Sequence, residues 1–303
     1  MIERLRRNSW NWLPAFLEIA ETGSVVHASR RLGLTAAAVS RTLRLLEAEL
    51  GQSLFNRVGR SLALNTTGAT LRDALRTAQR GIDAGLSDAL GATFSGPLRI
   101  ASIGVLTEHF VVPAVIDLYR THPEVIPEHL NLGTAEANAL LSRGQLDIAF
   151  YYEDVTHPHV LVEPLGKLPT SIYCGRSHPL FRKRRVTRSD LLEYAFSVPQ
   201  IGDTGRVLDG WPSEIPRRVG MRITMLRSNL QVSLSGALLT VLPDVTAAPH
   251  AEKRELRRLD AIVPPAVEVF SARHESASER GAVVTLTRNV AARVRAPARR
   301  RAR

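Results

Sequence analysis

The sequence contains a single cysteine, Cys174, among its 303 residues. It therefore cannot form an intrachain disulfide, a zinc site built of cysteines alone, or a redox switch between two cysteines of one chain. It also lacks any apolar stretch approaching the ~18 residues of a membrane helix, and its first residues, MIERLRRNSW, lack the apolar core of a secretory signal. We therefore expect a cytoplasmic protein with no membrane partner.

The motifs of common enzyme sites are absent as well. No G-x-S-x-G, G-x-G-x-x-G, P-loop or H-E-x-x-H pattern occurs. His157 and His159 come closest to a metal-binding pair, but no third ligand lies near them, and a solvent-exposed loop is the simpler interpretation. Cys174 lies in a predicted strand, where a lone thiol usually serves as a small buried side chain, and a sensing thiol is the alternative. The sequence predicts no catalytic residue, no metal site and no cofactor, so we expect the protein not to be an enzyme.

Lysine is scarce, with three of the forty basic residues, and the charge is unevenly distributed. Residues 1–65 hold nine basic and five acidic residues, whereas residues 66–96 hold three of each and residues 97–270 hold nineteen of each. Residues 271–303 hold nine basic and two acidic residues. The net charge of +11 therefore lies at the two ends, where a polyanion would bind, and the neutral middle suits a small ligand.

Residues 12–50 carry the pattern of a helix-turn-helix. Apolar residues at helical spacing predict a helix over 12–21 and a second helix over 24–32, which Gly33 ends. Thr35 then offers an N-cap hydroxyl to a third helix. Two helices joined by a short glycine turn are typical of this DNA-binding motif.

The third helix is expected to be amphipathic. Its apolar side, which should face the core, consists of Val39, Leu43, Leu46 and Leu50. Its other side begins with small residues and then presents longer polar ones: Ala36, Ala37, Ser40, Arg41, Arg44 and Glu47. This order would let the backbone approach a major groove while the longer side chains reach base edges and phosphates. An ordinary solvated helix face is the alternative.

A basic hairpin follows the third helix. Two short alternating runs, 53–56 and 61–65, flank a loop that contains Arg57 and Arg60. This arrangement predicts a two-stranded wing with both arginines at its tip. There they would lie along the sugar-phosphate backbone, adding affinity without sequence preference.

Four pieces of sequence follow one another in this region: A-S-R-R-L, V-S-R-T-L-R-L-L-E, L-G-Q-S-L-F-N-R and L-N-T-T-G. In this order and spacing they resemble the DNA-binding domain of LysR-type transcriptional regulators. The resemblance implies a winged helix-turn-helix on double-stranded promoter DNA, and the candidate DNA-binding residues are Thr35, Ala36, Ala37, Ser40, Arg41, Arg44, Arg57 and Arg60. Family members commonly carry Gln-Pro where this chain has Ala36-Ala37, so a side chain often used for base contact is absent.

A long helix is expected to connect this domain to the rest of the chain. From residue 67 to about 92, apolar residues recur at steps of three and four, at Leu71, Leu75, Ala78, Ile82, Leu86 and Ala89. The family resemblance implies that this helix pairs two subunits over a two-fold-related DNA site, so we expect a homodimer or homotetramer. A helix packed on its own chain is the alternative.

From Pro97 onward, strand-like and helix-like runs alternate, which favours parallel strands crossed by helices. Residues 98–151 resemble the first half of the family's effector domain, which has the fold of periplasmic solute receptors. The resemblance implies two lobes, one formed by about 97–167 with 267–295 and the other by about 168–266.

The expected fold class is therefore α/β overall, in four parts. These are an all-α winged helix-turn-helix over 1–65, a dimerisation helix over 66–96, a two-lobed effector domain over 97–295 and a basic disordered tail over 296–303.

The resemblance places the effector in the cleft between the lobes, at strand ends and helix N-termini, where unpaired backbone N–H groups favour anions. The candidate effector-binding residues are Ser102, Gly104, Thr107, Thr134, Gln200, Gly202 and Ser228. For each hydroxyl among them, plain helix capping is the alternative.

Together these features predict a sequence-specific transcriptional regulator whose promoter binding is modulated by a small-molecule effector, with RNA polymerase as a further partner. Three other classes stay open at this point: a two-lobed solute-binding protein without a regulatory role, a metabolic enzyme built on the same fold, and a nonspecific chromosome-binding protein acting through its arginine-rich ends.

Overall fold

The computed structural model describes residues 2–59, 61–89, 96–199, 202, 205, 207–275 and 281–296. The chain divides into two compact units, Met1–Gly91 with Arg143–Gln145, and Ala92–Ser142 with Leu146–Arg303. No helix within the described ranges combines the length and the hydropathy needed to cross a bilayer.

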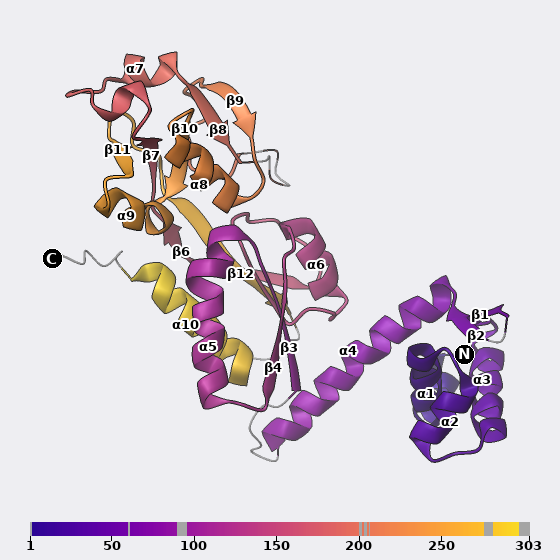
Figure 1. Ribbon diagram of the computed structural model, residues 1–303. Helices are drawn as coiled ribbons and strands as arrows, with labels where there is room; N and C mark the ends of the chain where they lie inside the picture. Colours follow the sequence, from indigo (N-terminus) through magenta and orange to yellow (C-terminus); the bar gives the residue numbers. More distant parts are fainter. Residues whose placement is uncertain are drawn as a thin grey trace. The chain divides into compact units, whose positions relative to one another are not determined.

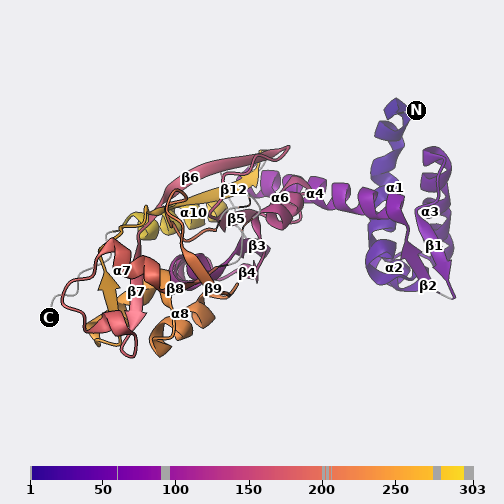
Figure 2. The ribbon, with the colours of Figure 1, turned by 90° about the horizontal axis from the view of Figure 1, so that it is seen from above.

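The first unit opens with three helices, α1 Ile2–Thr22, α2 Val25–Leu32 and α3 Ala36–Leu50. Two views show α1 beside α2 (Figures 1 and 2). Ser24 caps α2, and Thr35 caps α3 because its Oγ1 accepts a hydrogen bond from the Ala38 backbone N–H at 3.1 Å. Gly33 has a φ of 65°, which glycine adopts without strain. The predicted helix-turn-helix is therefore confirmed.

The start of α1 differs from the prediction. The helix begins at Ile2 rather than near residue 12, and it contains Pro14. The first ten residues are largely polar and show no apolar repeat, so periodicity alone did not identify them as helical.

The core of this unit collects the apolar sides of all three helices. Val39, Leu43 and Leu46 of α3 are buried, as predicted, and Leu50 is partly buried. They pack with residues from α1, α2 and the segment after α3, namely Ala15, Phe16, Ile19, Ala28, Leu54 and Phe55. This burial leaves the opposite side of α3 in solvent.

The wing is a two-stranded antiparallel hairpin, β1 Phe55–Val58 and β2 Ser61–Leu64. Val58 pairs with Ser61, so the turn contains only residues 59 and 60, and Gly59 has a φ of 61°. Arg57 therefore lies inside β1, opposite Leu62, and not at the tip where the sequence pattern had placed it. Arg60 lies outside the described residues.

The connecting helix α4 runs from Thr66 to Ala89. Leu71 and Leu75 pack on the core of the first unit, so this part of the apolar stripe serves its own chain. Farther along, Ile82 is 45% exposed. Packing on its own chain is thus confirmed for Leu71 and Leu75, and pairing of two subunits through the rest of α4 stays a prediction.

A close backbone approach ties α4 to the segment before the wing. A Cβ added at Gly68 would lie 2.1 Å from the Leu54 carbonyl oxygen and 2.8 Å from a Leu64 methyl carbon. We expect Gly68→Ala to lower the free energy of unfolding by about 1–3 kcal/mol, because backbone must move to admit the methyl group. Thr70→Ala, at an exposed position of the same helix, should be nearly neutral in the same urea titration. Equal stability of the two variants would contradict the packing described here.

In the second unit, lobe 1 is built on a five-stranded sheet with the order β4-β3-β5-β12-β6. The strands are β3 Gly96–Ser102, β4 Val125–Leu130, β5 Ile148–Tyr151, β6 Val160–Leu168 and β12 Val267–His274. One side of the sheet is covered by a π-helix, Leu106–Val111, that continues into α5 Val112–Thr121, and by α10 Gly281–Arg295. The other side is covered by α6 Thr134–Ser142.

Lobe 2 repeats this plan with the strand order β11-β7-β10-β8-β9. Its strands are β7 Thr170–Gly175, β8 Ala195–Val198, β9 Arg218–Arg222, β10 Leu239–Pro243 and β11 Leu256–Leu259. A 3-10 turn, Pro179–Phe181, and α7 Arg188–Glu193 lie over one side. The other side carries α8 Leu226–Ser235 and α9 Asp244–Glu252.

The sheets are mixed rather than wholly parallel. In lobe 1, β3 is parallel to β4 and β5, but β12 pairs antiparallel with both β5 and β6. Lobe 2 likewise pairs β7 antiparallel with β10 and β11. Alternation of strands and helices predicts parallel pairing only for two strands that follow one another in the chain through a crossover helix. The antiparallel pairs of both lobes join strands that are not connected in this way. Of the tail expected over 296–303, residues 297–303 lie outside the described part of the chain.

Candidate functional site

The solvent side of α3 carries most of the residues predicted to bind DNA. Ala36, Ala37, Arg41 and Arg44 are exposed, and Ser40 is partly exposed. No acidic partner for the two arginines occurs among the described residues, and the one contact of the Arg44 guanidinium is a weak bond from Nε to the Ser40 carbonyl oxygen at 3.4 Å. Their charges are therefore available to a polyanion.

Two polar residues of this region, one of them predicted to bind DNA, make local structural contacts instead. The Thr35 hydroxyl is engaged in the cap of α3. Glu47, expected on the free side of α3, turns its Oε1 to accept the Leu54 backbone N–H at 2.7 Å. This contact fixes the start of the segment leading to the wing, where Arg57 is exposed on β1.

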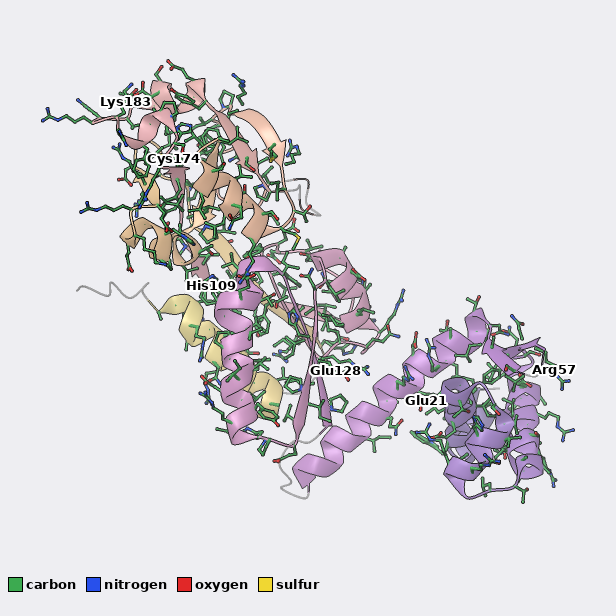
Figure 3. The ribbon with its side chains drawn as sticks, viewed as in Figure 1. Glu21, Arg57, His109, Glu128, Cys174 and Lys183 are labelled. Atoms are coloured by element: carbon green, nitrogen blue, oxygen red, sulfur yellow. The ribbon has the colours of Figure 1, made fainter. Side chains whose placement is uncertain are left out.

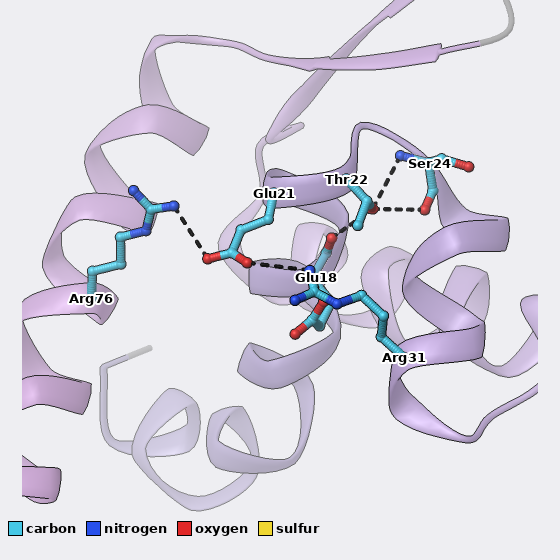
Figure 4. Close-up of polar contacts among 6 residues, drawn as sticks. All are labelled: Glu18, Glu21, Thr22, Ser24, Arg31 and Arg76. Atoms are coloured by element: carbon cyan, nitrogen blue, oxygen red, sulfur yellow. Dashed lines mark hydrogen bonds and ion pairs between the residues drawn. The ribbon is translucent and has the colours of Figure 1, made fainter. Parts of the chain in front are cut away.

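An ion-pair network links α1, α2 and α4 (Figure 4). Arg31 of α2 contacts Glu18 at 3.1 Å and Glu21 at 3.5 Å, both on α1, and Glu21 also contacts Arg76 of α4 at 3.2 Å. The basic residue Arg31 is thus neutralised within the domain. Because these charges are partly exposed, the network adds orientation more than stability.

The second unit contains a cavity of about 680 Å³ between the two lobes. Four of the predicted effector-binding residues line it: Gly104, Thr107, Thr134 and Gly202. Two others do not, since Ser102 is buried behind Thr107 and Ser228 is an exposed residue of α8. Gln200 lies outside the described residues.

Ser102 does not line the cavity, but it contacts two residues that do. Its Oγ lies 2.9 Å from the Thr107 hydroxyl and 2.8 Å from His129 Nε2. Burial lowers the pKa of His129 below its ordinary value, so the ring is neutral at pH 7 and can donate or accept according to its tautomer. Sequence reasoning missed His129 because it belongs to an edge strand with no motif of its own.

Carboxylates of the cavity wall are largely engaged. Asp209 is ion-paired with Arg217 at 2.7 Å, and both side chains are more than nine-tenths buried. The Arg217 guanidinium also lies over the Trp211 ring, 5.0 Å from its centroid. Glu153 is 5% exposed and accepts a hydrogen bond from the Thr134 hydroxyl at 3.3 Å. Thr134 is the first residue of α6, and its hydroxyl donates to this carboxylate.

Two contacts join the lobes, and both start from the π-helix of lobe 1. Glu108 Oε1 lies 3.3 Å from Arg227 Nε of α8, and His109 Nε2 lies 3.3 Å from the Thr246 hydroxyl of α9. Burial lowers the pKa of His109, only partly opposed by Glu108. The wide turns of a π-helix are frequent at functional sites, and here they present neighbouring side chains to lobe 2.

The start of α8 offers an unsatisfied polar side chain to the cavity. Asn229 is 3% exposed, and its Oδ1 has no hydrogen-bond partner within the described residues. Met225 at the N-cap supplies no side-chain cap. A buried acceptor without a partner costs free energy, which a bound donor would recover.

Comparison with known families decides the identity. Residues 10–69 match the family described as "Bacterial regulatory helix-turn-helix protein, lysR family", and residues 91–295 match "LysR substrate binding domain". The chain belongs to the LysR family. It is a LysR-type transcriptional regulator with an N-terminal helix-turn-helix domain and a C-terminal effector-binding domain, as the sequence resemblance implied. A solute-binding protein without a regulatory role is not favoured.

Two relatives are named as HTH-type transcriptional regulators. The uncharacterized HTH-type transcriptional regulator YbhD of Escherichia coli is 25% identical over 86% of this chain and 89% of its own length. The HTH-type transcriptional regulator AlsR of Bacillus subtilis is 28% identical over 59% of this chain and 60% of its own length.

Solved structures share the fold of this LysR-type regulator. A full-length variant of OxyR of Pseudomonas aeruginosa superposes with a TM-score of 0.66, 20% identity and coverage of 92% of this chain and 96% of that one. Full-length LysG of Corynebacterium glutamicum, with bound effector Arg, gives a TM-score of 0.62, 23% identity and coverage of 93% and 96%.

The regulator's one cysteine lies apart from both sites. Cys174 is fully buried in β7, and no group of three potential metal ligands occurs in the described part of the chain. Burial raises the pKa of the Cys174 thiol to about 11, although Arg257 opposes the shift. The thiol is therefore protonated and a weak nucleophile at neutral pH.

We expect Cys174 to react with Ellman's reagent at pH 8 about two orders of magnitude more slowly in the folded protein than in urea, because so little thiolate is present. Cys174→Ser should give no signal in either state. Rapid modification of the folded wild-type protein would mean that the thiol is reactive, as a sensing cysteine must be.

Proposed function

We propose that this LysR-type regulator reads promoter DNA with the solvent side of α3 in the major groove. Ser40, Arg41 and Arg44 contact base edges, while the backbone at Ala36 and Ala37 approaches the groove closely. Arg57 on β1, together with Arg60, contacts phosphates. The observation that carries this proposal is the pair of exposed arginines without acidic partners on a helix whose opposite side is locked into the core.

The roles of base-reading and phosphate-binding residues can be separated by competition binding. Arg44→Ala should reduce the preference for the specific site over random DNA by about 5- to 150-fold, the equivalent of a base contact of ~1–3 kcal/mol. Arg57→Ala should weaken binding to both DNAs alike and flatten the salt dependence by about one unit. Arg288→Ala, on α10, serves as the control. Equal losses on specific and random DNA for both variants would reject the assignment.

We further propose that a small molecule in the cavity between the lobes modulates DNA binding by favouring one arrangement of the subunits. Gly104, Thr107, Thr134, Gly202, His129 and Asn229 are the residues proposed to meet it, with Ser102 acting through Thr107. Gln200 and Ser228 stay as predictions from the sequence alone. The polar donors and acceptors that converge on a largely apolar cavity support this role.

The chain is proposed to act in the cytoplasm, without enzymatic activity, as a homodimer or homotetramer. The exposed Ile82 on α4 supports pairing of two linker helices. RNA polymerase is the proposed recipient of the regulatory signal. The functional parts are taken to be 1–65, 66–96, 97–295 and 296–303, as the sequence pattern indicates.

Asn229 provides a test of the cavity. Asn229→Leu should leave the free energy of unfolding unchanged or raise it by up to ~1 kcal/mol, because an unpaired buried acceptor is removed. In cells that carry a reporter gene behind a promoter regulated by this protein, the same change should abolish the rise or fall in reporter activity that the wild-type protein gives when the growth condition changes.

The matched control is Asn138→Leu. Asn138 is equally buried, but it accepts from the Tyr151 hydroxyl at 2.9 Å and donates to the Val155 carbonyl oxygen at 3.1 Å. Its replacement should lower the free energy of unfolding by about 1–3 kcal/mol because these partners are orphaned. If Asn229→Leu destabilised the protein as much as Asn138→Leu, Asn229 would be a structural residue and not a ligand contact.

A further inference from the structure

The neutral charge of the middle of the chain conceals a concentrated basic segment. Residues 176–189 contain six basic residues and no acidic residue. The remainder of 97–270 holds thirteen basic and nineteen acidic residues. The segment therefore stands out as a positive surface on an otherwise acidic domain.

The charges of this segment are exposed and mostly unpaired. Arg182, Arg184, Arg185 and Arg188 are all exposed, and none has an acidic partner within the described residues. Lys183 differs, because its Nζ contacts Asp190 at 2.7 Å. We call residues 182–188 the basic loop.

The backbone of the basic loop is held in place from below. Arg257 of β11 directs its Nη1 at the carbonyl oxygens of Leu180 and Phe181, each at 2.9 Å, and of Lys183, at 2.6 Å. This buttress fixes the entry to the loop. A loop that is already ordered loses less conformational entropy when it binds a partner.

The exit of the loop is fixed as well. Thr187 and Asp190 form a reciprocal capping box at the start of α7, and Asp190 also receives Lys183. The pKa of Asp190 is lowered to about 2 by its bonds with Lys183 and Thr187, so the carboxylate stays ionised and engaged. Asp190 therefore holds the loop in place and does not pair with the four exposed arginines.

The surface is chemically suited to phosphates. Guanidinium groups bind phosphate oxygens in bidentate fashion, and such contacts need no apolar surroundings. Between residues 162 and 218 the described chain exposes no large hydrophobic side chain. The loop and its neighbours in sequence thus lack the apolar centre that a protein partner would normally require, which favours a nucleic-acid backbone.

The loop also lies at an accessible end of lobe 2. It runs into the first residue of α7, on the end of lobe 2 that faces away from lobe 1, where Lys183 also lies (Figures 1 and 3). The cavity between the lobes is at the opposite end of lobe 2, so the loop is separate from the effector site.

We propose that the basic loop of lobe 2 binds the phosphate backbone of double-stranded DNA outside the stretch held by the helix-turn-helix. This rests on the proposed DNA-binding function. The loop adds affinity and salt dependence but no sequence preference, because arginine-phosphate contacts do not report base identity.

The test compares full-length wild-type protein with R182Q/R184Q/R185Q on two DNA fragments. One fragment is limited to the interval that the triple variant still protects in footprinting, and the other extends it by roughly five helical turns on each side. Each lost phosphate contact should reduce the slope of log affinity against log salt by about 0.9. The triple variant should therefore flatten the slope on the long fragment by about 2 to 3 for each subunit whose loop contacts DNA, and leave the short fragment nearly unchanged.

Two matched variants separate local contact from general electrostatics. R218Q/R222Q/R288Q removes the same charge from exposed positions on β9 and α10, and should keep the wild-type difference between the fragments. R182K/R184K/R185K keeps the charge of the loop and should retain most of the slope. Thermal unfolding of each variant checks that the fold is intact.

Identical slopes for the loop variant and the β9/α10 variant on the long fragment would overturn the proposal. Unchanged DNA binding combined with lower transcription in a purified system would also overturn it, and would assign the loop to an acidic protein surface. Failure of the proposed function is a distinct result: the wild-type protein would then show no preferred sequence, and the loop would be judged by the slopes on random DNA.

Discussion

The rotation of α3 about its own axis is set by the burial of Val39, Leu43 and Leu46 against α1 and the segment after α3. One residue of slippage would turn the helix by about 100° and bring an arginine toward Phe16 and Ile19. Such a state would bury an unpaired charge, at a cost far above that of the observed arrangement. Hydrophobic burial on one side of the helix thus determines which side chains face solvent. The capped turn and the Arg31 network hold the neighbouring helices in the same register.

The second unit uses its charges differently. In the cleft, Asp209 is neutralised by Arg217 and Glu153 is engaged by Thr134, so the acidic residues mainly order the walls. The wall also carries neutral polar groups, the His129 ring and the Asn229 amide. On the outer end of lobe 2, by contrast, guanidinium groups are displayed without compensation on a braced loop. Both uses have one physical cause. A charge that is buried away from water needs a partner, whereas an exposed charge is solvated by water and stays available for binding.

Local patterns predicted the first unit well because its signals are local. The Thr35 cap, Gly33 and the apolar stripe of α3 each act within a few residues of chain. The wing was predicted, but the place of Arg57 within β1 depends on which residues pair across the hairpin. The first turns of α1 have no apolar repeat and were missed.

In the second unit the antiparallel return of β12 depends on pairing between segments far apart in sequence. His129, Glu153 and Asn229 meet in the cleft through the same long-range folding, so no spacing rule could have grouped them.

The interior position of the only thiol has a practical consequence. Any cysteine introduced on the surface would be the single readily labelled group of the subunit, with no need to remove the native residue first. A nitroxide placed at the exposed Ile82 would show by pulsed electron paramagnetic resonance whether two copies of α4 lie close together. Labels on β9 and on α5 would report in the same way on opening and closing of the lobes. The buried sulfur of β7 therefore makes this regulator well suited to distance measurements in solution.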